Sequence, residues 1–220
     1  MHDSEICSLN RISDVVKGPA IIYISIDAGG NEASSIYESV KSKAGETFSF
    51  YELIVKNWDD YLTPWPMQMG KRNFEGKADT LLSIIESETI PIIESEIGLS
   101  EDVFIAGYSL GGLFSLWSLY ESNIFSGAVS CSGSLWYKGW TEYIREKELS
   151  RNAKIYLSLG DKEKNTKNSY MKLVEDNTIY QKEVFESSKE VIGICYEVNN
   201  GGHFSDVVGR MTKGISWILK

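Results

Sequence analysis

Residues 103–117 read VFIAGYSLGGLFSLW, and this stretch determines how the rest of the chain is interpreted. Its first four residues are apolar without alternation, which is typical of a strand that is buried on both faces. The pattern Gly-x-Ser-x-Gly follows from Gly107 to Gly111, and an apolar run occupies residues 113–117. The stretch therefore predicts a strand, a sharp turn and a helix, with Ser109 raised on the turn.

Ser109 is the candidate nucleophile of this turn. A serine lifted onto such an elbow leaves no room for side chains two positions before and after it, which explains the glycines at 107 and 111. A serine hydroxyl is a poor nucleophile near neutral pH. It needs an adjacent base to take its proton and a third group to orient that base.

The chain offers only two histidines as bases, His2 and His203. His2 lies at the terminus, whereas His203 lies in a Gly-rich loop between the last predicted strand and the last predicted helix. A histidine that follows the serine in chain order, at the end of a late strand, has the position expected of the catalytic base. We therefore expect His203 to be the base.

The orienting acid is expected between the strand that ends at Leu159 and His203. Asp161 and Glu163 both satisfy this condition. Glu163 is favoured because the carboxylate of many hydrolases with this layout comes about three residues after a strand-ending glycine, here Gly160. Asp161 remains open because it is nearer to the strand. Either carboxylate would hold the imidazole tautomer and stabilise the imidazolium.

The oxyanion that forms during acyl transfer needs two N–H donors. By elbow geometry the first is the backbone N–H of Leu110, which directly follows the serine. The second is expected from Ala28 or Gly29, in the loop after the apolar strand at 20–26.

Aromatic residues gather in two segments that could line a substrate pocket. Residues 57–74 form a long aromatic loop, and loops of this length often line a site. Residues 131–137 follow another predicted strand and contain a second aromatic pair. The alternative is that these rings pack in the core and its rim. The candidate substrate-binding residues are Trp58, Trp65, Tyr108 and Trp136.

Strands and helices alternate along most of the chain, which predicts one domain with a mostly parallel sheet covered by helices on both faces. In such sheets ligands bind beyond the carboxyl ends of the strands. The predicted strands are 5–9, 20–26, 48–55, 103–106, 125–130, 154–159 and 191–198. The predicted helices are one that is capped by Asn31 or Ser34 and runs to about residue 43, one at 76–97 that Pro91 kinks or divides, one after the elbow, one at about 167–189 and one capped by Ser205.

Composition excludes several classes of partner. The 220 residues carry 22 Lys and Arg against 31 Asp and Glu, a formal charge of -9, which argues against nucleic acid or an anionic membrane. The basic pair Lys71-Arg72 is interpreted as a solvated loop tip. No stretch is apolar enough to span a membrane, and no secretion signal is recognisable, so a cytoplasmic protein is expected.

The three cysteines, Cys7, Cys131 and Cys195, are widely spaced and odd in number, which predicts reduced thiols. No pair of Cys or His has the spacing of metal ligands, so neither a metal nor a cofactor is expected. Cys131 is an alternative nucleophile, but it has no glycine frame. We therefore expect it to be a small buried residue at a strand end.

Four motifs together resemble α/β-hydrolases of the putative esterase (esterase D) group, whose relatives include enterochelin, feruloyl and acetylxylan esterases, S-formylglutathione hydrolases and mycolyltransferases. The motifs are GYSLGG at 107–112, SGSLW at 132–136, GDKE at 160–163 and GGH at 201–203. The Ser-Leu-Trp segment is the most particular, being similar to a strand-end segment of siderophore esterases.

The resemblance implies a single-domain α/β-hydrolase fold over residues 1–220, with shortened N-terminal strands because the central strand begins early. It implies Ser109 as nucleophile, His203 as base and an acid within 161–163, in an esterase that acts on a small-molecule ester through an acyl-enzyme. Some siderophore esterases in this group use a Ser-His pair, so a dyad stays open. An acyltransferase and a non-catalytic binding protein on the same scaffold are the alternative functions.

Overall fold

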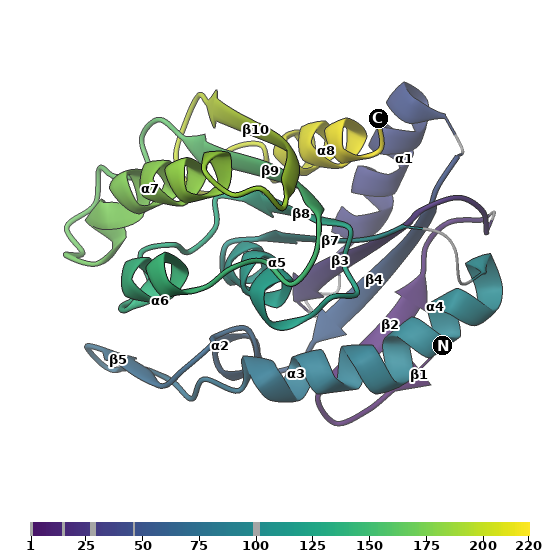
Figure 1. Ribbon diagram of the computed structural model, residues 1–220, viewed down its shortest axis with the longest axis horizontal. Helices are drawn as coiled ribbons and strands as arrows, with labels where there is room; N and C mark the ends of the chain where they lie inside the picture. The colour runs from purple at the N-terminus through teal and green to yellow at the C-terminus, as the bar shows by residue number, and fades with distance from the viewer. Residues whose placement is uncertain (1, 15, 27–29, 46, 99–101) are drawn as a thin grey trace.

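The strand before the Gly-x-Ser-x-Gly turn is β7 (Val103–Tyr108), and it lies in the middle of an eight-stranded sheet (Figure 1). The computed structural model describes residues 2–14, 16–26, 30–45, 47–98 and 102–220. The sheet order is β1 (His2–Asp3), β2 (Cys7–Arg11), β4 (Ser49–Val55), β3 (Ala20–Ile26), β7, β8 (Gly127–Cys131), β9 (Ala153–Gly160) and β10 (Val191–Asn199).

The six strands from β4 to β10 in this order are parallel to one another, whereas β2 pairs antiparallel with both β4 and β1. The mostly parallel sheet is therefore confirmed. β1 has only two residues, in agreement with the expected shortening at the N-terminal edge. Because the carboxyl ends of parallel strands meet at one edge, the loops after β7, β8, β9 and β10 come together there.

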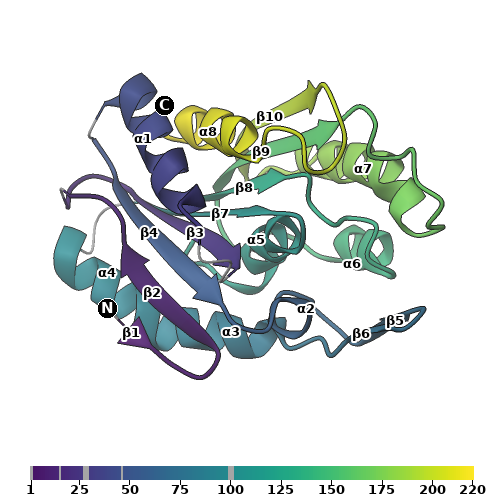
Figure 2. The ribbon, with the colours of Figure 1, turned by 180° about the vertical axis from the view of Figure 1, so that it is seen from behind.

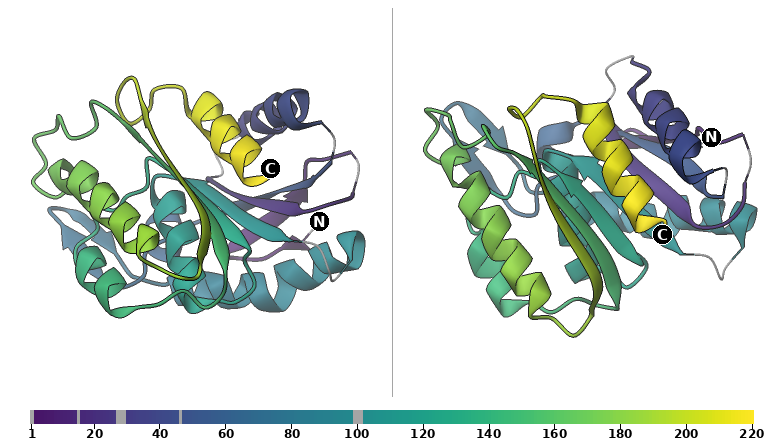
Figure 3. Two further views of the ribbon diagram at one scale, coloured as in Figure 1. Left: turned by 45° about the horizontal axis from the view of Figure 1, so that its top comes forward. Right: turned by 90° about the horizontal axis from the view of Figure 1, so that it is seen from above.

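Helices cover both faces of the sheet, as predicted (Figures 1 and 2). On one face α1 (Glu32–Ala44) and α8 (Val207–Ile218) lie side by side, which is clearest from above (Figure 3). The other face is covered by α3 (Ala78–Ile84), η1 (Ile85–Thr89), α4 (Ile90–Ile97), α5 (Leu110–Glu121), α6 (Trp140–Glu146) and α7 (Val174–Glu186).

The central strand β3 shows why its sequence is apolar without alternation. Ile22 and Ile24 pack in the core beneath α5, whereas Ile21 and Tyr23 pack in the core beneath α1 and α8. Successive side chains of a strand point to opposite faces, so a strand covered on both faces needs an apolar residue at every position.

Two local expectations were wrong. Residues 57–74 are not an irregular loop, because they contain α2 (Trp58–Tyr61) and a hairpin of β5 (Met67–Met69) and β6 (Arg72–Phe74). This hairpin extends away from the central sheet, at the same end of the molecule as the beginning of α7 (Figures 1 and 2). The helix at 78–97 is divided close to Pro91, as expected: the π-helical turn η1 separates α3 from α4, and Pro91 lies in the first turn of α4, where proline is tolerated.

The second correction concerns the last helix, which is capped by Asp206 and not by Ser205. The Asp206 side chain accepts a hydrogen bond from the N–H of Gly209, three residues into the helix. The Ser205 hydroxyl instead accepts from the N–H of Gly202 at 3.0 Å, which tightens the loop that carries His203.

The helix expected at 167–189 is shorter than predicted. It begins with a 3-10 turn, η2 (Met171–Leu173), and ends with α7 at Glu186. None of the helices in the described ranges has the length and apolar content that crossing a membrane requires.

Candidate active site

Ser109 stands at the junction of β7 and α5 in a strained conformation. Its φ of 57° and ψ of -120° are rare for a residue with a side chain, and such outliers cluster at functional sites. A Cβ at Gly107 would lie 2.3 Å from the backbone of Gly111. The close approach of strand and helix therefore requires glycine at 107, as predicted from the sequence.

Gly111 is required less strictly. A Cβ there would lie 3.2 Å from the tip of the Trp58 ring, a side chain that can shift. The following residue is more constrained, because a Cβ at Gly112 would lie 2.8 Å from the Ser130 hydroxyl and 3.0 Å from the Gly133 backbone. The start of α5 therefore packs closely against the loop after β8.

The carboxyl edge of the sheet brings Ser109, His203 and Glu163 together. The Ser109 Oγ lies 3.0 Å from Nε2 of His203, and Nδ1 of the same ring lies 2.8 Å from Oε2 of Glu163. His203 follows β10 and Glu163 follows β9, so three strand ends contribute one side chain each. The Glu163 side chain is only 2% exposed, whereas that of His203 is 30% exposed.

Asp161 has a different environment, although the sequence left it open as the acid. Its Oδ1 accepts a hydrogen bond from the N–H of Gly201 at 2.8 Å. Asp161 is exposed. In the described part of the chain it does not contact His203, whose Nδ1 is paired with Glu163. Its carboxylate braces the base of the histidine loop, while Glu163 reaches the imidazole.

The second carboxylate oxygen of Glu163, Oε1, is surrounded by donors. It accepts hydrogen bonds from the Ser132 hydroxyl at 2.6 Å, the Gly160 N–H at 2.7 Å and Nη1 of Arg210 at 3.0 Å. Burial acts to raise the pKa of Glu163, but the hydrogen bonds from His203, Ser132 and Gly160 outweigh it and hold the pKa below its ordinary value. Glu163 is thus kept ionised beside the imidazole.

Tyr108 lines the cavity, as expected, but its hydroxyl is committed to the protein. It donates to the backbone carbonyl of His203 at 2.5 Å and accepts a hydrogen bond from Arg210, and it lies 3.0 Å from the Ser132 hydroxyl, whose single proton is donated to Glu163. Burial raises the pKa of Tyr108 to about 12, so the phenol remains a donor. Tyr108 therefore fixes the backbone of the histidine loop.

The structure describes one of the expected oxyanion donors, Leu110. Leu110 is the first residue of α5 and lines the cavity, and the N–H groups of a first helical turn have no partner within the helix. The expected second donors, Ala28 and Gly29, lie outside the described residues. The Ser134 hydroxyl lies 3.3 Å from the Ser109 Oγ, and the Ser134 N–H donates to the Ser109 carbonyl at 2.9 Å.

A cavity of about 510 Å³ opens beside the serine. Of the four aromatic residues predicted for substrate binding, Trp58, Tyr108 and Trp136 line it. Trp65 does not, and this expectation is corrected: its Nε1 donates to the Lys138 carbonyl at 2.8 Å, and its ring packs against Tyr137 and Tyr143. Trp65 anchors the base of the β5–β6 hairpin instead.

Arg72 also lines this cavity, although the sequence placed it on a solvated loop tip. Its Nε donates to Oδ2 of Asp59 at 2.6 Å, so the guanidinium is held at the cavity rim by an ion pair with α2. The rest of the lining is largely apolar and includes the exposed Phe204 and Ile26.

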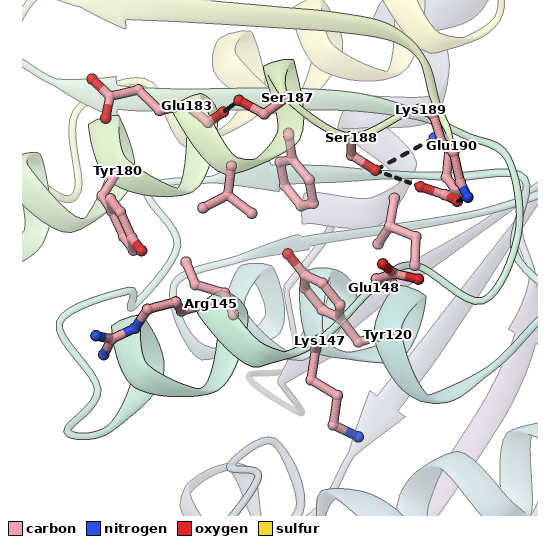
Figure 4. Close-up of a pocket in the computed structure, with 14 residues that line it drawn as sticks. Tyr120, Arg145, Lys147, Glu148, Tyr180, Glu183, Ser187, Ser188, Lys189 and Glu190 are labelled. Atoms are coloured by element: carbon pink, nitrogen blue, oxygen red, sulfur yellow. Dashed lines mark hydrogen bonds and ion pairs between the residues drawn. The ribbon is translucent and has the colours of Figure 1, made fainter.

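A second cavity of about 520 Å³ lies between α6 and α7 (Figure 4). Buried apolar side chains, among them Phe185 and Ile144, form its floor. Tyr120 lies between the two helices, and Figure 4 shows Arg145 turned away from the centre. This cavity contains no histidine, and its serines bond to nearby groups of the same segment.

Cys131 is not a second nucleophile. Its side chain is fully buried at the end of β8, and burial raises the pKa of its thiol to about 12. Within the described ranges no three His, Cys, Asp or Glu side chains gather in a way that could hold a metal ion.

Arg210 and Ser132 belong to this site but were missed from the sequence. Arg210 had a readable signal, because it lies three residues after Val207 and one before Met211 on the apolar face of the last helix. A charge on a core-facing position needs a buried partner. Ser132 had no comparable signal, since its role depends on a left-handed φ of 48° that the sequence does not reveal.

Comparison with known proteins gives matches at the levels of family and fold. The family model described as Putative esterase matches residues 51–206. No curated protein matches the chain.

Among solved structures, siderophore hydrolase EstA from Aspergillus nidulans is similar over 97% of this chain and 89% of its own, with a TM-score of 0.71 and 16% identity. An IroE-like serine hydrolase from Shewanella oneidensis is similar over 96% and 74%, with a TM-score of 0.75 and 15% identity. The BES protein from Bacillus cereus is similar over 99% and 96%, with a TM-score of 0.65 and 17% identity. At sequence identities this low, the structural similarity shows a shared fold alone.

Proposed function

Because this chain belongs to the Putative esterase family, which supports hydrolysis of esters, we propose that it is a serine hydrolase that cleaves a small-molecule carboxylic ester through an acyl-enzyme. Ser109 is the nucleophile, His203 the general base and acid, and Glu163 the orienting carboxylate. The observation that carries the proposal is the continuous chain of hydrogen bonds from Ser109 Oγ through both ring nitrogens of His203 to Glu163.

Acylation uses this chain directly. Nε2 of His203 takes the hydroxyl proton as Ser109 Oγ attacks the carbonyl carbon of the ester, and the imidazolium is stabilised by the Glu163 carboxylate. The negative charge moves onto the carbonyl oxygen, where the Leu110 N–H is one proposed donor. The imidazolium then returns the proton to the leaving alcohol as the carbon–oxygen bond breaks.

Deacylation repeats the steps with water. His203 removes a proton from the water as it attacks the acyl carbon, and the same proton passes to Ser109 Oγ when the carboxylic acid leaves. The free enzyme is restored without any cofactor.

The cavity supports an ester with an aromatic or other apolar portion. Trp58, Trp136 and Phe204 offer ring faces, and Val174 and Val207 offer aliphatic surface. Structures of the same fold include siderophore hydrolases and a ferulic acid esterase. A substrate panel should therefore contain p-nitrophenyl esters of graded acyl length, a feruloyl ester and a catecholate siderophore.

A fluorophosphonate probe tests the nucleophile without knowledge of the substrate. We expect the probe to add once to the protein, with the modified peptide containing Ser109, and we expect no addition to Ser109→Ala. Labelling of the wild type at another serine, or equal labelling of the variant, would refute the proposal. Hydrolysis of the ester panel by the wild type, absent in the variant, then identifies the preferred acyl group.

A further inference from the structure

Arg210 is a buried cation behind the proposed triad. It lies on α8 with 1% of its surface exposed, and its ion-pair partner is Glu163. Nη1 lies within hydrogen-bond distance of Glu163 Oε1 at 3.0 Å, the Ser132 hydroxyl at 2.8 Å and the Tyr108 hydroxyl at 3.1 Å. Nη2 donates to the Gly202 carbonyl at 3.1 Å.

These four contacts reach the ends of four adjacent strands. Tyr108 ends β7, Ser132 follows β8, Glu163 follows β9 and Gly202 follows β10. One guanidinium therefore joins the loops that carry the nucleophile, the acid and the base. A planar fork of donors is suited to this task, since a lysine ammonium has no comparable fixed geometry.

The backbone leaves space for this side chain. A Cβ at Gly160 would lie 2.8 Å from Nη2 of Arg210 and 2.9 Å from Oε1 of Glu163. Glycine at the end of β9 therefore permits the guanidinium and the carboxylate to meet. Among the described residues, none is a hydrogen-bond partner of Arg210 Nε, so this charge is buried at a cost that its other contacts must offset.

We propose that Arg210 is a positioning residue that fixes Glu163 against His203 and, through its charge, extends the activity of the triad to lower pH. This inference rests on the proposed function. Arg210 holds Oε1, which leaves Oε2 directed at Nδ1 of His203, and it holds the Gly202 carbonyl next to the histidine. Geometry and charge thus act through Glu163, without contact between Arg210 and substrate.

The charge effect has a definite sign. Glu163 is needed in its ionised form, because only the carboxylate can stabilise the imidazolium that forms on His203. Arg210 donates a hydrogen bond to Oε1 and places a positive charge beside it, and both favour the ionised form. Without Arg210, Glu163 would take up a proton more readily, so the acidic limb of the activity profile would move to higher pH.

Other ionisable groups near this network do not replace Arg210. The groups on the neighbouring strands, Tyr108 on β7, Cys131 on β8, Asp161 after β9 and Glu197 on β10, are neutral or acidic. The lysines on either side of Glu163, Lys162 and Lys164, are exposed, and Lys164 is paired with Glu175. Arg72 at the cavity rim is paired with Asp59. From α1, Glu32 accepts a hydrogen bond from Tyr23 of β3, and on α8 Asp206 caps the helix. The next cation on α8, Lys213, is paired with Glu197 and also donates to Asn199.

The experiment measures the second-order rate of fluorophosphonate labelling at Ser109 between pH 5 and 9. We expect Arg210→Met to lower the plateau rate about a hundredfold, as a displaced catalytic group does, and to move the acidic limb upward by about one pH unit. Arg210→Lys retains the charge. Its acidic limb should therefore lie at the same pH as that of the wild type, and its plateau rate of labelling should fall less than that of Arg210→Met. Lys213→Met removes a positive charge one turn away and should change neither.

A second comparison separates action through Glu163 from general structural damage. The double variant Glu163→Gln/Arg210→Met removes both charges, so no buried carboxylate is left uncompensated, and circular dichroism verifies its fold. If Arg210 acts through Glu163, the double variant should be labelled at the rate of Glu163→Gln alone. This comparison decides the matter even if Arg210→Met does not fold.

The inference is overturned if Arg210→Met folds and retains the wild-type pH profile, or if the double variant is labelled about tenfold more slowly than Glu163→Gln. Failure of the wild type to label at Ser109 has a different meaning. It would refute the proposed function itself, on which the role of Arg210 depends.

Discussion

Two cavities in the described part of the chain have nearly equal volumes, about 510 Å³ beside Ser109 and about 520 Å³ between α6 and α7, but different chemistry. The first collects a strained serine, a histidine and a buried carboxylate from three strand ends. The second is a cleft between two helices (Figure 4), where Ser187 and Ser188 bond within their own segment and the Tyr120 hydroxyl accepts a hydrogen bond from Gln181. Volume alone therefore does not identify a site.

The difference lies in convergence of polar groups. At the carboxyl edge, a single oxygen of Glu163 faces three donors from three different elements, Ser132, Gly160 and Arg210. Such an arrangement costs stability unless every member is satisfied, so it indicates a site that is held for a purpose. At the cleft, Lys147 forms an exposed ion pair with Glu121, and exposed ion pairs contribute little to the stability of the fold.

Loss of the nucleophile or the base should have the largest effect on activity, and it tests whether the first cavity is the site of chemistry. We expect Ser109→Ala and His203→Ala each to lower kcat by about a million-fold, because neither group functions without the other. Steady-state hydrolysis of p-nitrophenyl esters measures the loss, and thermal midpoints from circular dichroism verify folding. Substantial activity in either folded variant would mean that the first cavity is not the site of chemistry.

Exchange of the acid should have the next largest effect. Glu163→Gln should lower kcat about ten-thousand-fold, since the imidazole loses the carboxylate that sets its tautomer and stabilises its charge. Asp161→Asn is the matched control, and it should change kcat by less than about threefold because the Asp161 carboxylate accepts a hydrogen bond from the Gly201 backbone and, among the described residues, does not contact His203. Equal losses in both variants would leave the acid unassigned, and full activity in both would indicate a Ser-His dyad.

Acidification should lower the activity of the wild type in a simple way. The pKa of Glu163 is held below its ordinary value, so the carboxylate stays ionised while the pH falls from 8 to 5. A histidine ordinarily takes up its proton in this range, and the protonated ring cannot act as the base. We therefore expect kcat/KM to fall about tenfold per pH unit on the acidic limb, with a slope of one. A flat profile would contradict the role of His203.

Much of the fold could be predicted because its strands are apolar on both faces. The expected strand at 20–26 agrees with β3, and the parallel order follows from the alternation of strands and helices. The π-helical turn and the β5–β6 hairpin could not be predicted, because each depends on tertiary contacts. Trp65, for example, fixes the hairpin by its hydrogen bond to Lys138, 73 residues away in the chain.

The meeting of Ser109, His203 and Glu163 could also be predicted, since each follows the end of a strand and strand ends meet at one edge. Sequence reasoning could not separate Glu163 from Asp161 with certainty, because the turn at 160–163 directs the carboxylate of Asp161 outward and that of Glu163 inward. The assignment of Trp65 failed for a related reason. An aromatic ring in a long segment gives no indication of which cavity it will face.

A pair of side-chain truncations, one in each cavity, tests which cavity binds the substrate. Their effects on activity should be the smallest of those predicted. Phe185 is 1% exposed in the floor of the α6–α7 cleft and stacks on Tyr120, with ring centroids 6.0 Å apart. Phe185→Ala should therefore lower the free energy of unfolding by about 3–5 kcal/mol while kcat/KM stays within about twofold. Urea denaturation and ester hydrolysis, both measured below the transition temperature, test the two parts.

Trp58→Ala is the matched change at the first cavity, where the half-buried ring covers the elbow. It should raise KM about tenfold, as loss of one aromatic contact of about 1.4 kcal/mol does, with a smaller loss of stability than Phe185→Ala. A large fall of kcat/KM in Phe185→Ala, with Trp58→Ala unchanged, would reverse the assignment of the cavities. The substrate would then enter from the cleft, and convergence of polar groups would mark the chemistry without marking the binding surface.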